Sequence, residues 1–359
     1  MRKLNPFRPG SARLKRNAAA SAAKTAAAVA ALCAFQTACA ACTATMGNIN
    51  FGNIDPLNPG NLTAQAQLTV TCSRDRTGWT AFRYSEYMNV CLAVDGGRAS
   101  GWNNRTTNPR GLCLNGSCAG STPLYYNLYT DSNYSTIWGT PNLSATPNVF
   151  QTTFTFPARN TASQSNTFTV YAKLNEPFTG LVPGAYSIAY TEGATALASA
   201  SSTGSMPASC GSMQTIRFPF TVSANIIKNC IVGTPDDIDF GTAAPTDTNL
   251  QGQASFNVTC TNSTPYNIGL KPSNNSTTGA GIMSPTSSGN ADRVPYQLRS
   301  ASGANGKIWG NTATASANGN GVGGMGTGSA QSYTVYATVP SADYHYGEYR
   351  DTVTVMVNY

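Results

Sequence analysis

The chain has 359 residues, of which 10% are charged and 41% are hydrophobic. Seven of its 22 Lys and Arg residues, and none of its 15 Asp and Glu residues, lie within the first 40 positions, so the rest of the chain carries both charges in equal number. This balance argues against a basic surface for nucleic acid or an anionic membrane. The small charged fraction is typical of a secreted β-protein rather than a cytosolic enzyme.

Residues 1–40 have the features of a secretory signal peptide. A cationic stretch up to Lys24 is followed by a short Ala-rich apolar run and by Ala38-Cys39-Ala40, which fits an A-x-A cleavage site. We expect cleavage after Ala40. A lipoprotein signal is the competing interpretation, but no leucine stands three residues before Cys39 or Cys42. The apolar run is also too short for a membrane anchor.

The rest of the chain contains one module twice, because seven landmarks recur in the same order. In the first copy they are Cys42, Phe51-Gly52, Cys72, Tyr126–Leu128, Ile137–Gly139, Phe168–Ala172 and Gly184–Tyr186. In the second copy they are Cys230, Phe240-Gly241, Cys260, Tyr296–Leu298, Ile308–Gly310, Tyr333–Ala337 and Gly347–Tyr349. The repeat predicts a first unit over residues 41–224 and a second unit over residues 225–359.

Eight cysteines remain after removal of the signal, and an even number in an exported chain indicates disulfides. Two pairs have the same 29 residues between their members, and we predict both as disulfides: Cys42 with Cys72, and Cys230 with Cys260. Each would stabilise its unit by about 3–4 kcal/mol through loop closure. The other four cysteines leave three pairings open, of which one closes a short hairpin tip: Cys113 with Cys118, and Cys91 with Cys210.

Short alternating runs rich in Val, Ile, Thr, Tyr and Phe recur between Gly-, Pro-, Asn- and Ser-rich breaks, and no stretch after residue 40 keeps a helical period. The expected fold class is therefore all-β, with two tandem two-sheet sandwiches. Trp138 and Trp309 each follow a strand and are expected in the core.

The first copy continues past its last landmark with an alternating segment, Thr215–Val222. Its apolar side chains would lie on one face: Ile216, Phe218, Phe220 and Val222. Pro219 lacks a backbone N–H, so we expect this strand at a sheet edge or at a bulge.

The second copy closes with the strand Thr352–Tyr359, and no counterpart of residues 215–222 follows it. Its inward face is apolar to the last residue, so a sheet one strand short would leave an open gap. The residues expected to border this gap are Ile231, Ile238, Val353, Val355, Val357 and Tyr359. The alternative is a six-stranded unit that its own side chains close.

Taken together, the landmarks resemble those of the Spore Coat Protein U domain family, which includes the subunits of archaic chaperone-usher pili. The likeness covers nearly the whole chain after residue 40, twice, and is nearest to the two-domain tip adhesins of such pili. It implies immunoglobulin-like sandwiches, of which the second is incomplete and lacks its last strand. The second copy departs from the family pattern at Val339–Tyr349, which has no clean Pro-x-Gly-x-Tyr.

The resemblance also implies a function and partners. It implies a tip adhesin of a chaperone-usher fimbria that mediates surface attachment and biofilm formation at the cell surface. The expected partners are a periplasmic pilus chaperone, an outer-membrane usher, an adjacent pilin subunit that donates a strand, and an abiotic or host surface. After cleavage only Ala41 would precede Cys42. The chain is therefore expected to accept a strand and not to donate one.

Three long segments of the first unit, Ser73–Val90, Thr140–Asn166 and Thr191–Met213, are expected to be loops at one end of its sandwich. Their apolar residues are candidates for surface binding: Trp79, Phe82, Tyr84, Tyr87, Met88, Val149, Phe150, Leu197 and Met206. Apolar side chains gathered at one tip indicate an interaction site. The alternative is that they pack beneath their own loops. These residue types suit a hydrophobic surface and a glycan equally.

No motif points to catalysis, a cofactor or a metal. His345 is the sole histidine and has no Cys, Glu or second His at ligand spacing. Gly321–Gly326 matches G-x-G-x-x-G, but it leads into a strand rather than a helix. We expect a protein that is not an enzyme. A self-contained secreted surface or spore-coat-like structural protein with two closed sandwiches is the alternative function.

Overall fold

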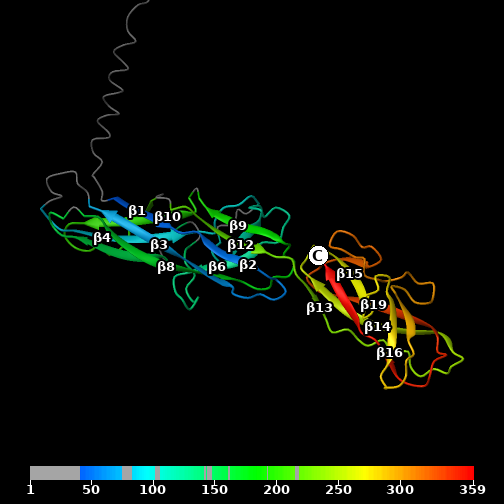
Figure 1. Cartoon of the computed structure of the whole chain (residues 1–359). Helices are drawn as coiled ribbons and strands as arrows, with labels where there is room; N and C mark the ends of the chain where they lie inside the picture. Colours follow the sequence, from blue (N-terminus) through cyan, green and yellow to red (C-terminus); the bar gives the residue numbers. More distant parts are fainter. Residues whose placement is uncertain are drawn as a thin grey trace, which may run out of the picture.

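The computed structural model describes residues 41–74, 83–101, 106–140, 143, 148–160, 162–191, 193–214 and 218–359. Within these ranges the regular elements are β-strands, which form two tandem immunoglobulin-like sandwiches that lie end to end (Figure 1). The all-β fold class is confirmed. Among the described residues, no helix has the length and apolar character needed to cross a bilayer.

The first unit contains an eight-stranded and a four-stranded sheet. Its strands are β1 (Ala41–Met46), β2 (Ile49–Ile54), β3 (Thr63–Ser73), β4 (Glu86–Val94), β5 (Arg110–Leu114), β6 (Leu124–Tyr129), β7 (Phe150–Phe156), β8 (Gln164–Leu174), β9 (Gly184–Tyr190), β10 (Thr195–Ser202), β11 (Met213–Gln214) and β12 (Phe220–Ile226). The orders are β1-β3-β8-β6-β5-β9-β12-β2 and β11-β10-β4-β7.

The second unit has a six-stranded and a three-stranded sheet. Its strands are β13 (Cys230–Val232), β14 (Thr248–Cys260), β15 (Pro265–Pro272), β16 (Ala280–Pro285), β17 (Val294–Arg299), β18 (Val322–Met325), β19 (Ala330–Ser341), β20 (Tyr349–Arg350) and β21 (Val353–Asn358). The orders are β13-β14-β19-β17-β16-β20 and β18-β15-β21.

The last strand of the first unit differs in two respects from its prediction. β12 begins after Pro219 and continues to Ile226, past the residue 224 at which we expected the unit to end. Of the two positions expected for it, the sheet edge is wrong, because β12 lies inside the sheet, antiparallel to β9 and parallel to β2; its pairing with β2 does shift register, as at a bulge, between Ser223 and Asn225. Pro219 is compatible with this position since it precedes the strand and therefore removes no ladder hydrogen bond.

Each unit is built around a buried tryptophan, as the sequence predicts. Trp138 is 0% exposed and its Nε1 donates to the carbonyl oxygen of Leu92 in β4 at 3.0 Å. Trp309 is 1% exposed and donates to the carbonyl oxygen of Ile268 in β15 at 2.9 Å. Leu92 and Ile268 therefore occupy equivalent positions in the two units.

Both units also contain a tyrosine corner, a feature of immunoglobulin-like sandwiches. The hydroxyl of Tyr186 donates to the carbonyl oxygen of Val182 at 3.1 Å. The hydroxyl of Tyr349 donates to the carbonyl oxygen of His345 at 2.7 Å. Tyr186 and Tyr349 each stand at or near the start of the strand that follows the corner, so they too are equivalent positions.

Four disulfides cross-link the described residues: Cys42–Cys72, Cys91–Cys210, Cys113–Cys118 and Cys230–Cys260. The first and the last join directly opposite residues, in β1 with β3 and in β13 with β14. The other two belong to the first unit alone. Of the three pairings left open for these four cysteines, the structure has the one in which Cys113–Cys118 closes the hairpin tip after β5.

The two units meet through side-chain amides. Asn229 Nδ2 donates to Asp55 Oδ2 at 2.6 Å, and Asn262 Nδ2 donates to the carbonyl oxygen of Gly180 at 2.9 Å. The hydroxyl of Tyr359 lies 3.3 Å from Asn229 Oδ1, so the end of the described chain lies near this junction (Figure 1).

Candidate functional site

The first unit shows how a complete sandwich of this kind covers its core. Inward-facing residues of β12 pack beside β9 and β2, where Ile188 is 1% exposed, Ile49 0% and Phe51 8%. The aromatic rings of Phe220 and Tyr190 stack at 4.3 Å between centroids. β12 therefore shields an apolar surface that would otherwise face water.

The second unit has no strand in the corresponding place among its described residues. β20 pairs only with β16 and β21 only with β15, so the other edge of each strand carries no partner strand. The counterpart of β2 is the segment around Phe240-Gly241, which forms no strand. Ile238 and Phe240 are half-buried, whereas their counterparts Ile49 and Phe51 are buried.

Beside these two free edges lie half-buried apolar residues that pack against the core, and we call this set the open groove: Val232, Ile238, Phe240, Tyr349, Val353, Val355 and Val357. The contrast with the first unit is clearest at Val357. Val357 lies opposite Ile268, and its counterpart Leu197 lies opposite Leu92. Leu197 is 0% exposed while Val357 is only half-buried, so the two positions differ in what covers them.

The structure brings together most of the predicted groove residues. Val353, Val355, Val357 and Ile238 line the groove. Ile231 does not, because it is 43% exposed and alternates along β13 with Cys230 and Val232, which pack inward. Tyr359 is 44% exposed and lies at the junction of the two units.

A polar pair that the sequence prediction missed links the core to Asp351, which lies between the groove residues Tyr349 and Val353 in the sequence. The hydroxyl of Tyr296 donates to Asp351 Oδ2 at 2.6 Å, and the backbone N–H of Thr352 donates to Asp351 Oδ1 at 2.8 Å. Burial, followed by the hydrogen bond to Asp351, raises the pKa of Tyr296 well above its ordinary value, so the phenol keeps its proton. An acidic residue between two apolar strand segments is the only signal that the sequence offers for this pair.

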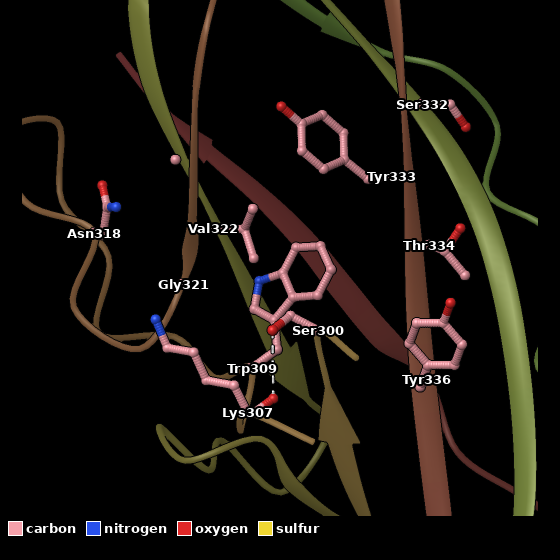
Figure 2. Close-up of a pocket in the computed structure, with 11 residues that line it drawn as sticks. Ser300, Lys307, Trp309, Asn318, Gly321, Val322, Ser332, Tyr333, Thr334 and Tyr336 are labelled. Carbon is pink, nitrogen blue, oxygen red and sulfur yellow. Dashed lines mark hydrogen bonds between the residues drawn. The ribbon is translucent and has the colours of Figure 1, made fainter. Parts of the chain in front are cut away.

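A hollow of about 470 Å³ lies at the opposite edge of the smaller sheet, beside β18. Figure 2 shows Trp309, Tyr333 and Val322 around it, with the side chains of Lys307 and Asn318 nearby. In the first unit Phe150 lies opposite Leu92, just as Val322 lies opposite Ile268. The ring of Phe150 sits 5.1 Å from Trp138 and 4.8 Å from Phe168. Valine is too short to fill that space, which explains the hollow.

The predicted surface-binding residues of the first unit divide into four groups. Trp79 and Phe82 lie outside the described residues. Tyr84 is 55% exposed and Met206 is 37% exposed, whereas Tyr87 and Val149 are half-buried.

The prediction of surface binding is wrong for Met88, Phe150 and Leu197, which are 0%, 7% and 0% exposed. They lie on the inward faces of β4, β7 and β10, so the segments expected to be loops contain core strands.

Tyr84 and Met206 lie at the same end of the first unit. Tyr87 and Ser202 are opposite each other in the β4–β10 pair, so the start of β4 and the end of β10 are neighbours. Arg74, which is 5% exposed, ties this end together: its guanidinium donates to the carbonyl oxygens of Tyr84 and Pro157 and lies 3.8 Å from Glu86 Oε2. This end lies away from the second unit (Figure 1).

The described ranges contain no group of three or more His, Cys, Asp or Glu side chains that could hold a metal ion.

Comparisons with known proteins relate the chain to one family. The model of the Spore Coat Protein U domain matches residues 23–191 and 216–356. No curated protein sequence matches the chain.

Solved structures with a similar arrangement include the chaperone–tip adhesion subunit pre-assembly complex of the archaic chaperone-usher Csu pili of Acinetobacter baumannii. Its identity is 15%, with 89% of this chain and 100% of that chain covered and a TM-score of 0.45. The CupB6 tip adhesin from Pseudomonas aeruginosa is 12% identical, with 89% and 93% covered and a TM-score of 0.31. A chaperone–tip adhesin complex of CFA/I fimbriae is 10% identical, with 87% and 96% covered and a TM-score of 0.33.

Proposed function

Because the chain belongs to the Spore Coat Protein U domain family, we propose that it is the tip adhesin of a chaperone-usher fimbria, whose second unit takes up a β-strand from a partner chain. The observation that carries the proposal is the open groove. β12 covers the corresponding surface of the first unit, whereas Ile238, Phe240 and Val357 of the second unit remain half-buried.

β12 is the template for what the groove would accept. A strand placed like β12 would hydrogen-bond to the free edge of β20, and its alternate side chains would enter the groove. Main-chain bonds would give affinity, while the apolar side chains Val353, Val355 and Phe240 would lose contact with water. In the cell a periplasmic pilus chaperone would fill the groove first, and the donor strand of the adjacent pilin subunit would replace it at an outer-membrane usher.

The first unit would be the part that attaches the fimbrium to an abiotic or host surface. Its own β12 already fills the place of a donor strand, so this unit needs no strand from a partner. The exposed side chains of Tyr84 and Met206 lie at the end away from the groove. A protein of this kind would be exported through the periplasm, act at the fimbrium tip and contribute to biofilm formation.

The proposal is tested by supplying the strand within the same chain. A copy of residues 213–226, which contain β11 and β12, is attached after Tyr359 through a Gly/Ser linker long enough to reverse direction. The matched control carries the same residues with each inward residue exchanged for its outward neighbour, because a one-residue slip turns every side chain to the other face. We expect the copy, but not the control, to raise the thermal unfolding temperature of the second unit and to protect the amides of β20 and β21 from hydrogen exchange.

A different result would favour the alternative function. If the unmodified protein is monomeric and as heat-stable as the protein with the copy, the groove needs no strand. The chain would then be a self-contained surface or coat structural protein.

A further inference from the structure

One carboxylate beside the groove indicates which type of side chain the donor strand carries opposite it. This inference rests on the proposed function. Strand pairing places the tyrosine two residues before this carboxylate, Tyr349, and the position of Asp351 follows by counting along the chain from it. Leu114 lies opposite Tyr186 in the β5–β9 pair, and Pro285 lies opposite Tyr349 in the β16–β20 pair. Tyr186 and Tyr349 are thus equivalent by register as well as by their corner hydrogen bonds. Two residues further on, Asp351 stands where the first unit has Ile188.

Ile188 is covered by the last strand of its unit. It lies directly opposite Val222 of β12, and the two residues are 1% and 0% exposed. Directly opposite residues in an antiparallel pair place their side chains on the same face. A strand that fills the groove as β12 fills the first unit would therefore set its Val222 equivalent against Asp351.

The present partners of Asp351 do not compensate the negative charge that such burial would remove from water. Its carboxylate accepts hydrogen bonds from Tyr296 and from the N–H of Thr352. Among the described residues no Lys, Arg or His forms an ion pair with it. Burying a carboxylate without a compensating charge is strongly unfavourable.

The first unit holds a buried cation in the corresponding region, where its guanidinium donates to the backbone oxygens of Asp95, Thr107 and Trp138. Arg110, opposite Tyr126 in the β5–β6 pair, is 0% exposed and lies by the paired hydroxyls of Tyr126 and Tyr190. The residue opposite Tyr296 is Gly281, and the ring of Tyr296 occupies the space that a side chain there would need. The second unit therefore has an acid in this region and cannot place a cation at the position of Arg110.

We infer that the strand which fills the open groove carries a lysine or arginine opposite Asp351, at the place that Val222 holds in β12. The ammonium or guanidinium group would accompany Asp351 into the covered groove as a hydrogen-bonded ion pair. The remaining inward positions of that strand would be apolar, like Phe220 and Ala224.

The test uses the full chain with the appended copy of residues 213–226. The copy carries Val222→Lys or Val222→Met, which differ in charge but little in length, and the original β12 stays unchanged. Both copies are made with Asp351 and with Asp351→Asn. We expect the lysine copy to raise the unfolding temperature of the second unit by a few degrees more than the methionine copy when Asp351 is present. With Asp351→Asn the methionine copy should be the better of the two.

The outcomes separate the two proposals. A methionine copy that stabilises as well as the lysine copy beside Asp351 would overturn the inference and leave the proposed function standing. An equal advantage of lysine in the Asp351→Asn protein would overturn it too. If no copy exceeds the control with inverted alternation, the proposed function fails and the inference fails with it.

Discussion

At the scale of single residues, Asp292 holds the tyrosine corner of the second unit. Its Oδ2 accepts the backbone N–H of His345 at 2.8 Å, and lies 3.0 Å from His345 Nδ1 and 3.2 Å from the hydroxyl oxygen of Tyr349. These hydrogen bonds, that of the His345 N–H first, lower the pKa of Asp292. A carboxyl whose pKa is lower in the folded than in the unfolded chain stabilises the fold above the unfolded value, and this contribution is lost as the pH falls through the folded value.

The Asp292→Asn variant should therefore be less stable than the parent at neutral pH, and the difference should shrink below about pH 4, the ordinary pKa of an aspartate. Urea unfolding at a series of pH values measures this. Asp343→Asn is the matched control, because it removes the same charge from the exposed turn before β20. A difference that stays constant from neutral to acidic pH would contradict the assignment.

Individual residues also mark where sequence prediction fails. Tyr84 and Met206 are exposed as expected, but Met88, Phe150 and Leu197 are core residues. Long intervals separate the landmarks of the first unit. A strand that contains no landmark, such as β4, β7 or β10, is therefore mistaken for part of a loop. The near-continuous apolar run from Val90 to Val94 is typical of a strand buried on both faces and could have revealed β4.

At the scale of elements, β18 and β7 occupy equivalent edges with different side chains. Phe150 packs between Trp138 and Phe168, whereas Val322 leaves the hollow beside Trp309. The Val322→Phe variant should fill this space and raise the free energy of unfolding of the second unit by about 0.5–2 kcal/mol, the usual range for filling a cavity. Phe150→Ala, the reverse change in the first unit, should cost about 3–5 kcal/mol.

Urea unfolding followed by tryptophan fluorescence measures both changes. A loss of stability in Val322→Phe would show that Trp309 and Tyr333 cannot accept a ring between them, and that the two edges are not equivalent.

The repeat predicts the elements well where a landmark lies inside a strand. Tyr296–Leu298 falls in β17 and Tyr333–Ala337 in β19, and their alternation places the inward residues correctly. The prediction fails for β12, whose position inside a sheet depends on pairing with β2, almost the whole unit away in sequence. Local alternation shows which face of a strand is apolar, but it does not show which strands flank it.

At the scale of the whole molecule, the end of the first unit and the groove of the second are expected to act separately. Replacing Tyr84 and Met206 by serine should lower attachment of the purified protein to polystyrene severalfold without changing its circular dichroism. The matched control replaces Tyr346 and Met325, which are also exposed but belong to the second unit. Equal losses in both variants would mean that attachment is nonspecific. If added sugars block binding of the protein to cells but leave its binding to polystyrene unchanged, the ligand on the cells is a glycan.

The path of the chain between the units has a mechanical consequence. β12 leads through residues 227–229 directly into β13, and it pairs with β9 over Phe220–Ile226 on one side and with β2 from Val222 to Ile226, with one register shift, on the other. A pulling force transmitted through this connection would act along the axis of β12 and load its flanking ladders in shear. Many hydrogen bonds would then share the tension, rather than breaking one at a time as in peeling. The strand that completes the first unit is thus also the one through which it would withstand traction.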